Sequence, residues 1–97
     1  MKILAIEHEN AGSRADDFAP LLENEARRVW ELYQAGVIRE VYFRQEQAAA
    51  VLMLECPDVT EAEETLASLP LAAAGLIWFE LIGLRAYPGF ERLFGQK

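Results

Sequence analysis

The chain has 97 residues, which fits a single domain over residues 1–97 and leaves no room for a second hydrophobic core. Hydrophobic residues make up 53% of it, a high share for a domain so small that much of its surface must face water. Sixteen acidic and nine basic residues give a net charge of −7, which argues against nucleic acid and anionic membrane surfaces as partners. No apolar run reaches the length that spans a bilayer.

The sequence contains one cysteine, Cys56, and one histidine, His8. One thiol cannot form an internal disulfide, and with one imidazole it falls short of the four ligands of a structural zinc site. The first apolar stretch ends at Glu7, unlike a secretory signal. We therefore expect a cytoplasmic protein without a metal, in which Cys56 is an inert buried thiol.

The first predicted element is a mostly buried strand over residues 2–8, which are rich in Ile and Leu. A loop of turn and cap residues follows it. Apolar residues then recur every three or four positions as far as Tyr33, which predicts a helix. We expect this helix to begin near Asp17, to hold Pro20 in its first turn and to end at Gly36.

Two apolar and β-branched runs come next, over residues 37–44 and 48–56, and the polar residues between them indicate an antiparallel hairpin. A second helix is predicted to extend to Leu69, just before a proline that closes it. Either Asp58 or Thr60 can cap its N-terminus.

A connector of small residues, 71–75, leads into a final strand over residues 76–86. Within this strand Gly83 suggests a bulge or a close backbone approach. The tail that follows can form one helical turn, which carries Phe90, Leu93 and Phe94. The order βαββαβ predicts an α+β, ferredoxin-like fold, in which two helices cover one face of a four-stranded antiparallel sheet.

The strands are apolar on both faces, although two helices can cover only one of them. In the last strand Phe79 and Leu81 alternate with Trp78 and Ile82, so neither set is polar. We expect a homodimer or a larger homo-oligomer to bury the open sheet face and the apolar tail, with two sheets packed face to face. The alternative is that the aromatic residues fill the core of a monomer.

Residues 32–36 lead into a strand that ends Tyr42-Phe43-Arg44, and Leu69-Pro70-Leu71 follows the second helix. The last strand contains Phe79-Glu80-Leu81-Ile82-Gly83-Leu84 and is followed by Tyr87-Pro88. In these motifs the sequence resembles the muconolactone delta-isomerase family. The resemblance implies a ferredoxin-like dimeric α+β barrel, a homo-oligomer, and a reaction without cofactor that shifts a proton next to a lactone carbonyl.

Glu80 and His8 are the candidate catalytic residues. Glu80 shares its strand face with Trp78 and Ile82, and partial burial there is expected to raise the pKa of its carboxyl toward the range useful for acid and base catalysis. His8 ends the first strand and can carry protons near neutral pH. The alternatives are a salt bridge at a subunit interface or at a strand edge for Glu80 and a solvated position for His8.

Arg44, at the end of the second strand, is the candidate for binding a substrate carboxylate, although an ion pair with Glu46 is equally open. A second arginine, Arg85, offers the same charge. Four further side chains are candidates for lining an apolar substrate pocket, and packing in the core is the alternative for each of them. They are Trp30, Tyr42, Met53 and Trp78.

The sequence therefore predicts a cofactor-independent, isomerase-like protein that binds a small organic acid or lactone in an apolar pocket. Two other functions stay open, because one fold hosts several functions. One is a non-catalytic module of the same fold that binds a small ligand or drives assembly, and the other is a cofactor-free oxygenase. Convergence of Glu80, Arg44 and His8 on one cavity would favour the enzyme.

Overall fold

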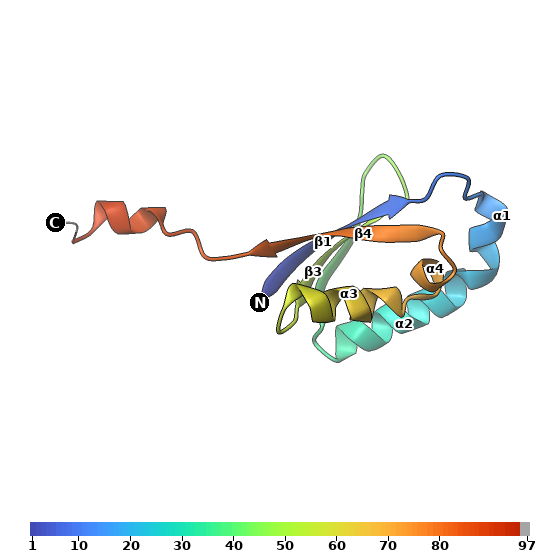
Figure 1. Cartoon of the computed structure of the whole chain (residues 1–97), viewed down its shortest axis with the longest axis horizontal. Coiled ribbons are helices and arrows are strands. Elements are labelled where there is room, and N and C mark those ends of the chain that lie inside the picture. The colour runs from blue at the N-terminus through green and yellow to red at the C-terminus, as the bar shows by residue number, and fades with distance from the viewer. Residues whose placement is uncertain (96–97) are drawn as a thin grey trace.

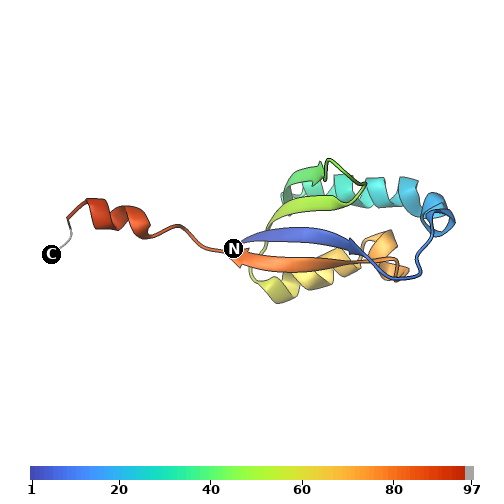
Figure 2. The same ribbon diagram turned by 90° about the horizontal axis from the view of Figure 1, so that it is seen from above.

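The computed structural model describes residues 1–95 and contains a four-stranded antiparallel sheet in the order β2-β3-β1-β4. Helices α2 and α3 cover one face of the sheet, and the other face is open (Figures 1 and 2). The elements follow one another as βαββαβ, which confirms the predicted ferredoxin-like fold. The strands are β1 (Lys2–Glu9), β2 (Ile38–Phe43), β3 (Ala50–Glu55) and β4 (Ile77–Leu84).

The first predicted helix is divided into three pieces and begins two residues earlier than expected. They are α1 (Ala15–Phe18), the 3₁₀ turn η1 (Ala19–Leu21) and α2 (Leu22–Gln34). The 3₁₀ turn coincides with Pro20, which lacks a backbone N–H and crowds the preceding turn. Gly36 ends the helical segment with a φ of +82°, a conformation that residues with a Cβ rarely adopt.

The second helix, α3 (Val59–Ala67), is capped by Asp58, whose side chain accepts a hydrogen bond from the backbone N–H of Glu61 at 2.8 Å. The structure thereby decides between the two predicted caps in favour of Asp58. The predicted small-residue connector is instead partly helical. Pro70 does not merely close α3 but begins the helical turn α4 (Pro70–Ala73), where the missing N–H of proline removes no helical bond.

The bulge lies in β2 rather than at Gly83. The ladder between β1 and β4 is continuous, with Ile3 opposite Gly83, whereas the register between β2 and β3 shifts between Ile38 and Glu40. A Cβ at Gly83 would meet its nearest side-chain atoms at 3.4 and 3.6 Å, so neither a bulge nor a close backbone approach calls for glycine there. Because a bulge adds one residue to its strand, the side chains that follow it change faces.

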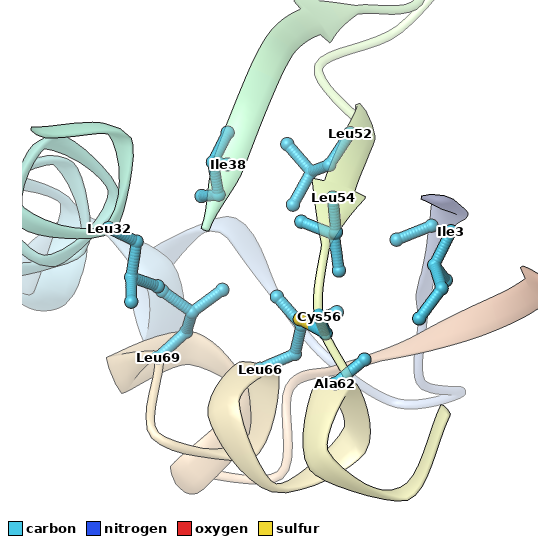
Figure 3. Packing of buried hydrophobic residues seen from close by; sticks show 10 residues of the cluster. Ile3, Leu32, Ile38, Leu52, Leu54, Cys56, Ala62, Leu66 and Leu69 are labelled. Atoms are coloured by element: carbon cyan, nitrogen blue, oxygen red, sulfur yellow. The ribbon is translucent and has the colours of Figure 1, made fainter. Parts of the chain in front are cut away.

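The hydrophobic core lies between the sheet and α2 and α3 (Figure 3). Side chains of β1 and β3 that point to the helices meet the apolar stripes of α2 and α3 there. Cys56 is buried in this cluster, and burial raises the pKa of its thiol, which agrees with an inert role. The cluster consists of Ile3, Ala5, Leu32, Ile38, Leu52, Leu54, Cys56, Ala62, Leu66 and Leu69.

The open face of the sheet is also apolar, as the sequence predicted. Trp78, Ile82 and Leu84 of β4 lie on this side and are exposed. Their neighbours on β1 and β3 are half-buried, among them Ile6 and Met53. No helix within residues 1–95 is long and apolar enough to cross a membrane.

The C-terminal arm, residues 85–95, leaves the end of β4 and projects beyond the sheet (Figures 1 and 2). It contains the predicted helical turn as the 3₁₀ helix η2 (Gly89–Leu93). The radius of gyration is 16.2 Å, whereas a compact chain of this length would have about 12.5 Å. The arm therefore does not fold onto its own domain.

Candidate active site

A cleft of 1130 Å³ lies between the first helical segment and the side of the sheet that faces the helices. Phe18, Val29 and Trp30 line it from the helices. Val41 and Phe43 line it from β2, because the bulge before Glu40 turns these two residues toward the helices. Most of the lining is apolar, as is usual for pockets that bind small organic molecules.

Glu7 brings a carboxyl group into this cleft from β1. It belongs to the row of β1 that faces the helices, next to the fully buried Ala5, and its own exposure is 8%. The backbone N–H of Ala50 donates a hydrogen bond of 2.9 Å to Glu7 Oε1. Burial raises the pKa of the Glu7 carboxyl, and the negative charge of Glu9 raises it further.

Glu25 brings a second carboxyl group into the cleft from α2. The backbone N–H of Leu71, in the first turn of α4, donates a hydrogen bond of 2.9 Å to Glu25 Oε1. Burial is again the main cause that raises the pKa of this carboxyl, and the charge of Glu7 adds to it. The charge of Glu7 therefore acts on Glu25 across the cleft.

The pair has the features of an acid–base site. Within residues 1–95, Oε2 of Glu7 and Oε2 of Glu25 make no hydrogen bond, so each carboxyl has an oxygen free for a ligand. A carboxyl with a raised pKa exchanges protons more readily near neutral pH than an ordinary one. Two such groups in one apolar cleft can remove a proton from a bound molecule and return one to it.

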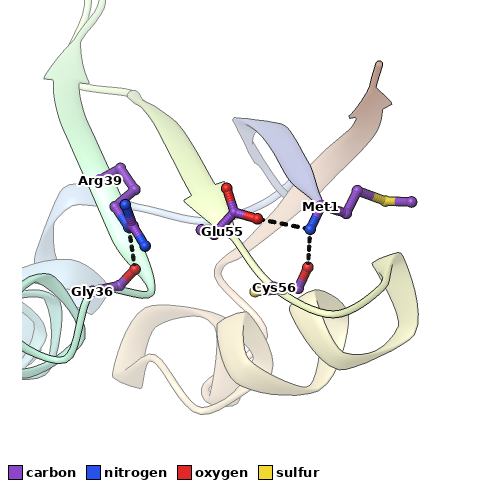
Figure 4. A network of polar contacts seen from close by, with 5 residues as sticks. All are labelled: Met1, Gly36, Arg39, Glu55 and Cys56. Atoms are coloured by element: carbon purple, nitrogen blue, oxygen red, sulfur yellow. Dashed lines mark hydrogen bonds and ion pairs between the residues drawn. The ribbon is translucent and has the colours of Figure 1, made fainter. Parts of the chain in front are cut away.

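Arg39 is the one cation among the described residues that line the cleft. Its Nε donates a hydrogen bond of 2.6 Å to the carbonyl oxygen of Gly36, which holds the guanidinium at the start of β2 (Figure 4). The described part of the chain, residues 1–95, has no group of three or more His, Cys, Asp and Glu side chains placed to hold a metal ion.

The predicted catalytic residues meet each other, but on the opposite face of the sheet. His8 Nε2 lies 3.0 Å from Glu80 Oε1, and the His8 ring stacks on Trp78 with ring centres 4.6 Å apart. These contacts follow from the ladder, in which His8 lies opposite Trp78 and Ile6 lies opposite Glu80. The pair is part of the open face and does not line the cleft.

The other predicted site residues are divided among three places. Arg44 donates hydrogen bonds to Glu46, at 2.8 Å from its Nη2, and does not line the cleft. Met53 lies on the open face, opposite Glu40 of β2. Trp30 lines the cleft, and Tyr42 lies at its β2 edge, where its hydroxyl donates a hydrogen bond of 2.8 Å to Glu40 Oε1. Glu80, Arg44 and His8 therefore do not converge on one cavity.

Glu7 and Glu25 were missed in the sequence, although each carries a recognisable signal. Glu7 continues the alternation of Ile3 and Ala5, so it is a charged residue on a strand face that is otherwise buried. Glu25 precedes Val29 by four positions, which places it on the apolar stripe of its helix. A carboxylate on a buried stripe is uncommon and often marks a functional position.

No protein-family model matches the sequence, and no curated protein is similar to it. Among solved structures, muconolactone isomerase superposes with a TM-score of 0.73 at 20% sequence identity, over 91% of this chain and 92% of the other. The chain has the fold of muconolactone isomerase. This likeness confirms the fold that the sequence motifs implied, and at 20% identity it carries the fold alone.

A second solved structure shows the same fold with another activity. It is a 5-chloro-2-hydroxyhydroquinone dehydrochlorinase from Burkholderia phenoliruptrix in complex with 2,5-dihydroxybenzoquinone. Its TM-score is 0.65 at 14% identity, over 92% of this chain and 98% of the other. The fold therefore serves both an isomerase and a dehydrochlorinase.

Proposed function

We propose that the protein is a cofactor-independent, isomerase-like enzyme that moves a proton on a small organic acid or lactone bound in the cleft. The observation that carries this proposal is the pair Glu7 and Glu25, whose carboxyl pKa values are both raised in one apolar cleft. Kinship in fold with an isomerase and a dehydrochlorinase supports it. An unoccupied oxygen on each carboxyl meets the need of the chemistry for a proton acceptor and a proton donor.

In the proposed reaction the two carboxyls begin in different protonation states. The ionised one removes a proton from the carbon next to the substrate carbonyl, and the electrons of the C–H bond form a new double bond toward that carbonyl. The neutral one then gives its proton to a carbon further along the conjugated system. The double bond has moved, one proton has been taken and one returned, and nothing has been oxidised or reduced.

The charge of the cleft limits the substrate. Glu7, Glu9 and Glu25 line it on the helix side of the sheet, against one lining cation, Arg39. A molecule with several carboxylates would be repelled there, whereas a neutral lactone or a monoacid held by Arg39 would be accepted. We therefore favour a lactone or a small monocarboxylic acid over a diacid.

Solvent exchange tests the chemistry without requiring the natural substrate. A panel of unsaturated lactones and monoacids is incubated with the protein in D₂O, and deuterium uptake next to the carbonyl is followed by NMR. We expect Glu7→Gln and Glu25→Gln to reduce uptake by about 100-fold or more, because each keeps the side-chain shape but loses the proton-transfer group. Glu64→Gln, on the exposed surface of α3, is the matched control.

Glu80→Gln separates the cleft from the open face. If it abolishes uptake while the two cleft variants remain active, the reaction takes place at the His8–Glu80 pair, and the cleft is not the active site. Ligands that shift the NMR signals of cleft residues without any deuterium uptake would instead support a non-catalytic binding module.

A further inference from the structure

The C-terminal arm is an ordered apolar segment without a surface to pack on. Phe90 and Phe94 are exposed to 65% and 72%. Within the arm, the Tyr87 ring lies against Gly89 at a place where a Cβ would collide with it, and meets Phe90 edge-on at 5.2 Å. A segment ordered in this way but exposed on its apolar side has the character of a docking element.

The accessible surface area of the chain also indicates a docking partner. Its accessible area is 6853 Å², whereas a compact monomer of 10.9 kDa would expose about 5600 Å². An excess of this size is expected for a chain that completes its packing against another molecule.

The cleft offers a matching apolar surface. Trp30 and Phe43 stand on its rim and are exposed to 56% and 67%. Tyr33 lies beside Trp30, with ring centres 5.9 Å apart, and extends this aromatic edge. The volume of 1130 Å³ exceeds the roughly 300–1000 Å³ of typical small-molecule pockets, so a small ligand would leave part of the cleft unfilled.

The charges of the two surfaces are complementary. Three glutamates, Glu7, Glu9 and Glu25, line the cleft on the helix side of the sheet against one arginine, and the arm carries Arg85 and Arg92 against one acidic residue, Glu91. Arg92 is exposed and lies between the apolar residues of the arm. Docking of the arm would therefore bring a guanidinium to a cleft with excess negative charge.

The arm is poorly placed to fill the cleft of its own chain. It leaves from β4, at one edge of the sheet, whereas β2, which lines the cleft, forms the opposite edge. It also projects away from the domain in both views (Figures 1 and 2). A second copy of the chain can offer its cleft without either restriction.

We propose that the arm of one copy docks into the cleft of a second copy, with Phe90 and Phe94 against the aromatic rim and Arg92 toward the acidic lining of the cleft. The second copy thereby contributes a cation to the site. That this cation serves a reaction rests on the proposed function, whereas the docking itself stands on the surfaces described above. The partner is thus another copy of this chain.

Site-specific crosslinking tests the docking without any activity measurement. Two single-cysteine chains are prepared in a Cys56→Ser background, an affinity-tagged Phe90→Cys and an untagged Tyr33→Cys, mixed and oxidised gently. We expect a disulfide-linked pair of one tagged and one untagged chain. The matched control replaces Tyr33→Cys with Glu64→Cys, on the exposed surface of α3, and is expected to give at least tenfold less of that pair.

Equal crosslinking to both positions, or none to Tyr33→Cys, would overturn the proposal. A chain that carries both Phe90→Cys and Tyr33→Cys and forms a disulfide between positions 90 and 33 within a monomer would also overturn it, because the arm would then fill its own cleft. In sedimentation experiments Arg92→Glu is expected to weaken self-association about tenfold, while Arg92→Lys retains it. Crosslinking with no deuterium uptake would refute the proposed function and leave the docking intact.

Discussion

Glu7 and Glu25 each bind a backbone N–H and also present a carboxyl oxygen to the cleft. The hydrogen bonds join β1 to β3 and α2 to α4, so both side chains contribute to the structure around the site. Glutamine keeps the Oε1 acceptor that these bonds use and removes the titrating group. Substitution by glutamine therefore separates the chemical role of each residue from its structural role.

Both raised pKa values have a consequence for stability, because an unfolded glutamate titrates near 4.5. Below that pH the two carboxyls are protonated in the folded and the unfolded chain. As the pH rises through the raised folded-state values, the folded chain holds protons that the unfolded chain has released, so stability falls by about 1.4 kcal/mol for each unit by which a pKa is raised.

We therefore expect Glu7→Gln and Glu25→Gln to gain stability relative to the parent as the pH increases from about 4 to about 8. Urea unfolding midpoints at several pH values, at one chain concentration, measure this. Glu46→Gln provides a control of opposite sign, since the hydrogen bond from Arg44 lowers the pKa of Glu46. If the urea midpoints of the parent and of the cleft variants changed in parallel with pH, the pKa values of the cleft carboxyls would not be raised.

Part of this site could be predicted from the residue types and from their order along each strand. Trp30 and Tyr42 were predicted to line a substrate pocket and are among the residues around the cleft, and their role in binding a substrate stays a prediction. His8 and Glu80 were each predicted as a catalytic residue and are in contact, yet on the open face. Their sequence neighbours indicate which residues share a strand face, but contain no information about which face the helices cover.

At the level of the elements, Asp58 shows how one side chain fixes the start of a helix. Its extended backbone and its carboxylate together satisfy an N–H of the first turn of α3 that has no partner within the helix. The helix in turn supplies Ala62 and Leu66 to the core. The cap therefore contributes to the stability of the whole domain.

We expect Asp58→Ala to lower the free energy of unfolding by about 1 kcal/mol, because the first turn loses its acceptor. Thr60→Ala is the matched control, since Thr60 lies inside α3 and is not its cap. Chemical denaturation of both variants gives the comparison. An equal loss from both variants would show that Asp58 does not act as the cap.

Most elements could be predicted because their signals are local. Proline, glycine and the apolar period mark where helices and strands begin and end, and these signals act over a few residues. The bulge in β2 gave no such signal, because it arises from the pairing of β2 with β3. Its consequence is large, since it turns Val41 and Phe43 into the cleft.

At the level of the whole molecule, the open face is a second apolar surface besides the arm. It combines Trp78 and Ile82 with the His8–Glu80 pair, and no part of residues 1–95 covers it. Face-to-face packing with a second copy would bury these residues, as the sequence predicted. Such packing and the docked arm use different surfaces, so both can be present in one assembly.

We expect Ile82→Glu to weaken self-association by at least tenfold, because a charge without a partner would be buried between the sheets. Sedimentation over a range of chain concentrations measures it, with circular dichroism as a check on folding. Gln34→Glu, exposed at the end of α2, adds the same charge elsewhere and is the control. A parent chain that is monomeric at micromolar concentration would contradict burial of the open face.

The order of elements, the surplus of apolar residues and the absence of a basic surface could all be read from the chain, because each depends on composition or on neighbours in sequence. The position of the site could not be read from the sequence. Both faces of the strands are apolar, so the alternation of side chains does not reveal which face the helices bury. Only the packing of α2 against the sheet places Glu7 and Glu25 in the cleft and leaves His8 and Glu80 on the open face.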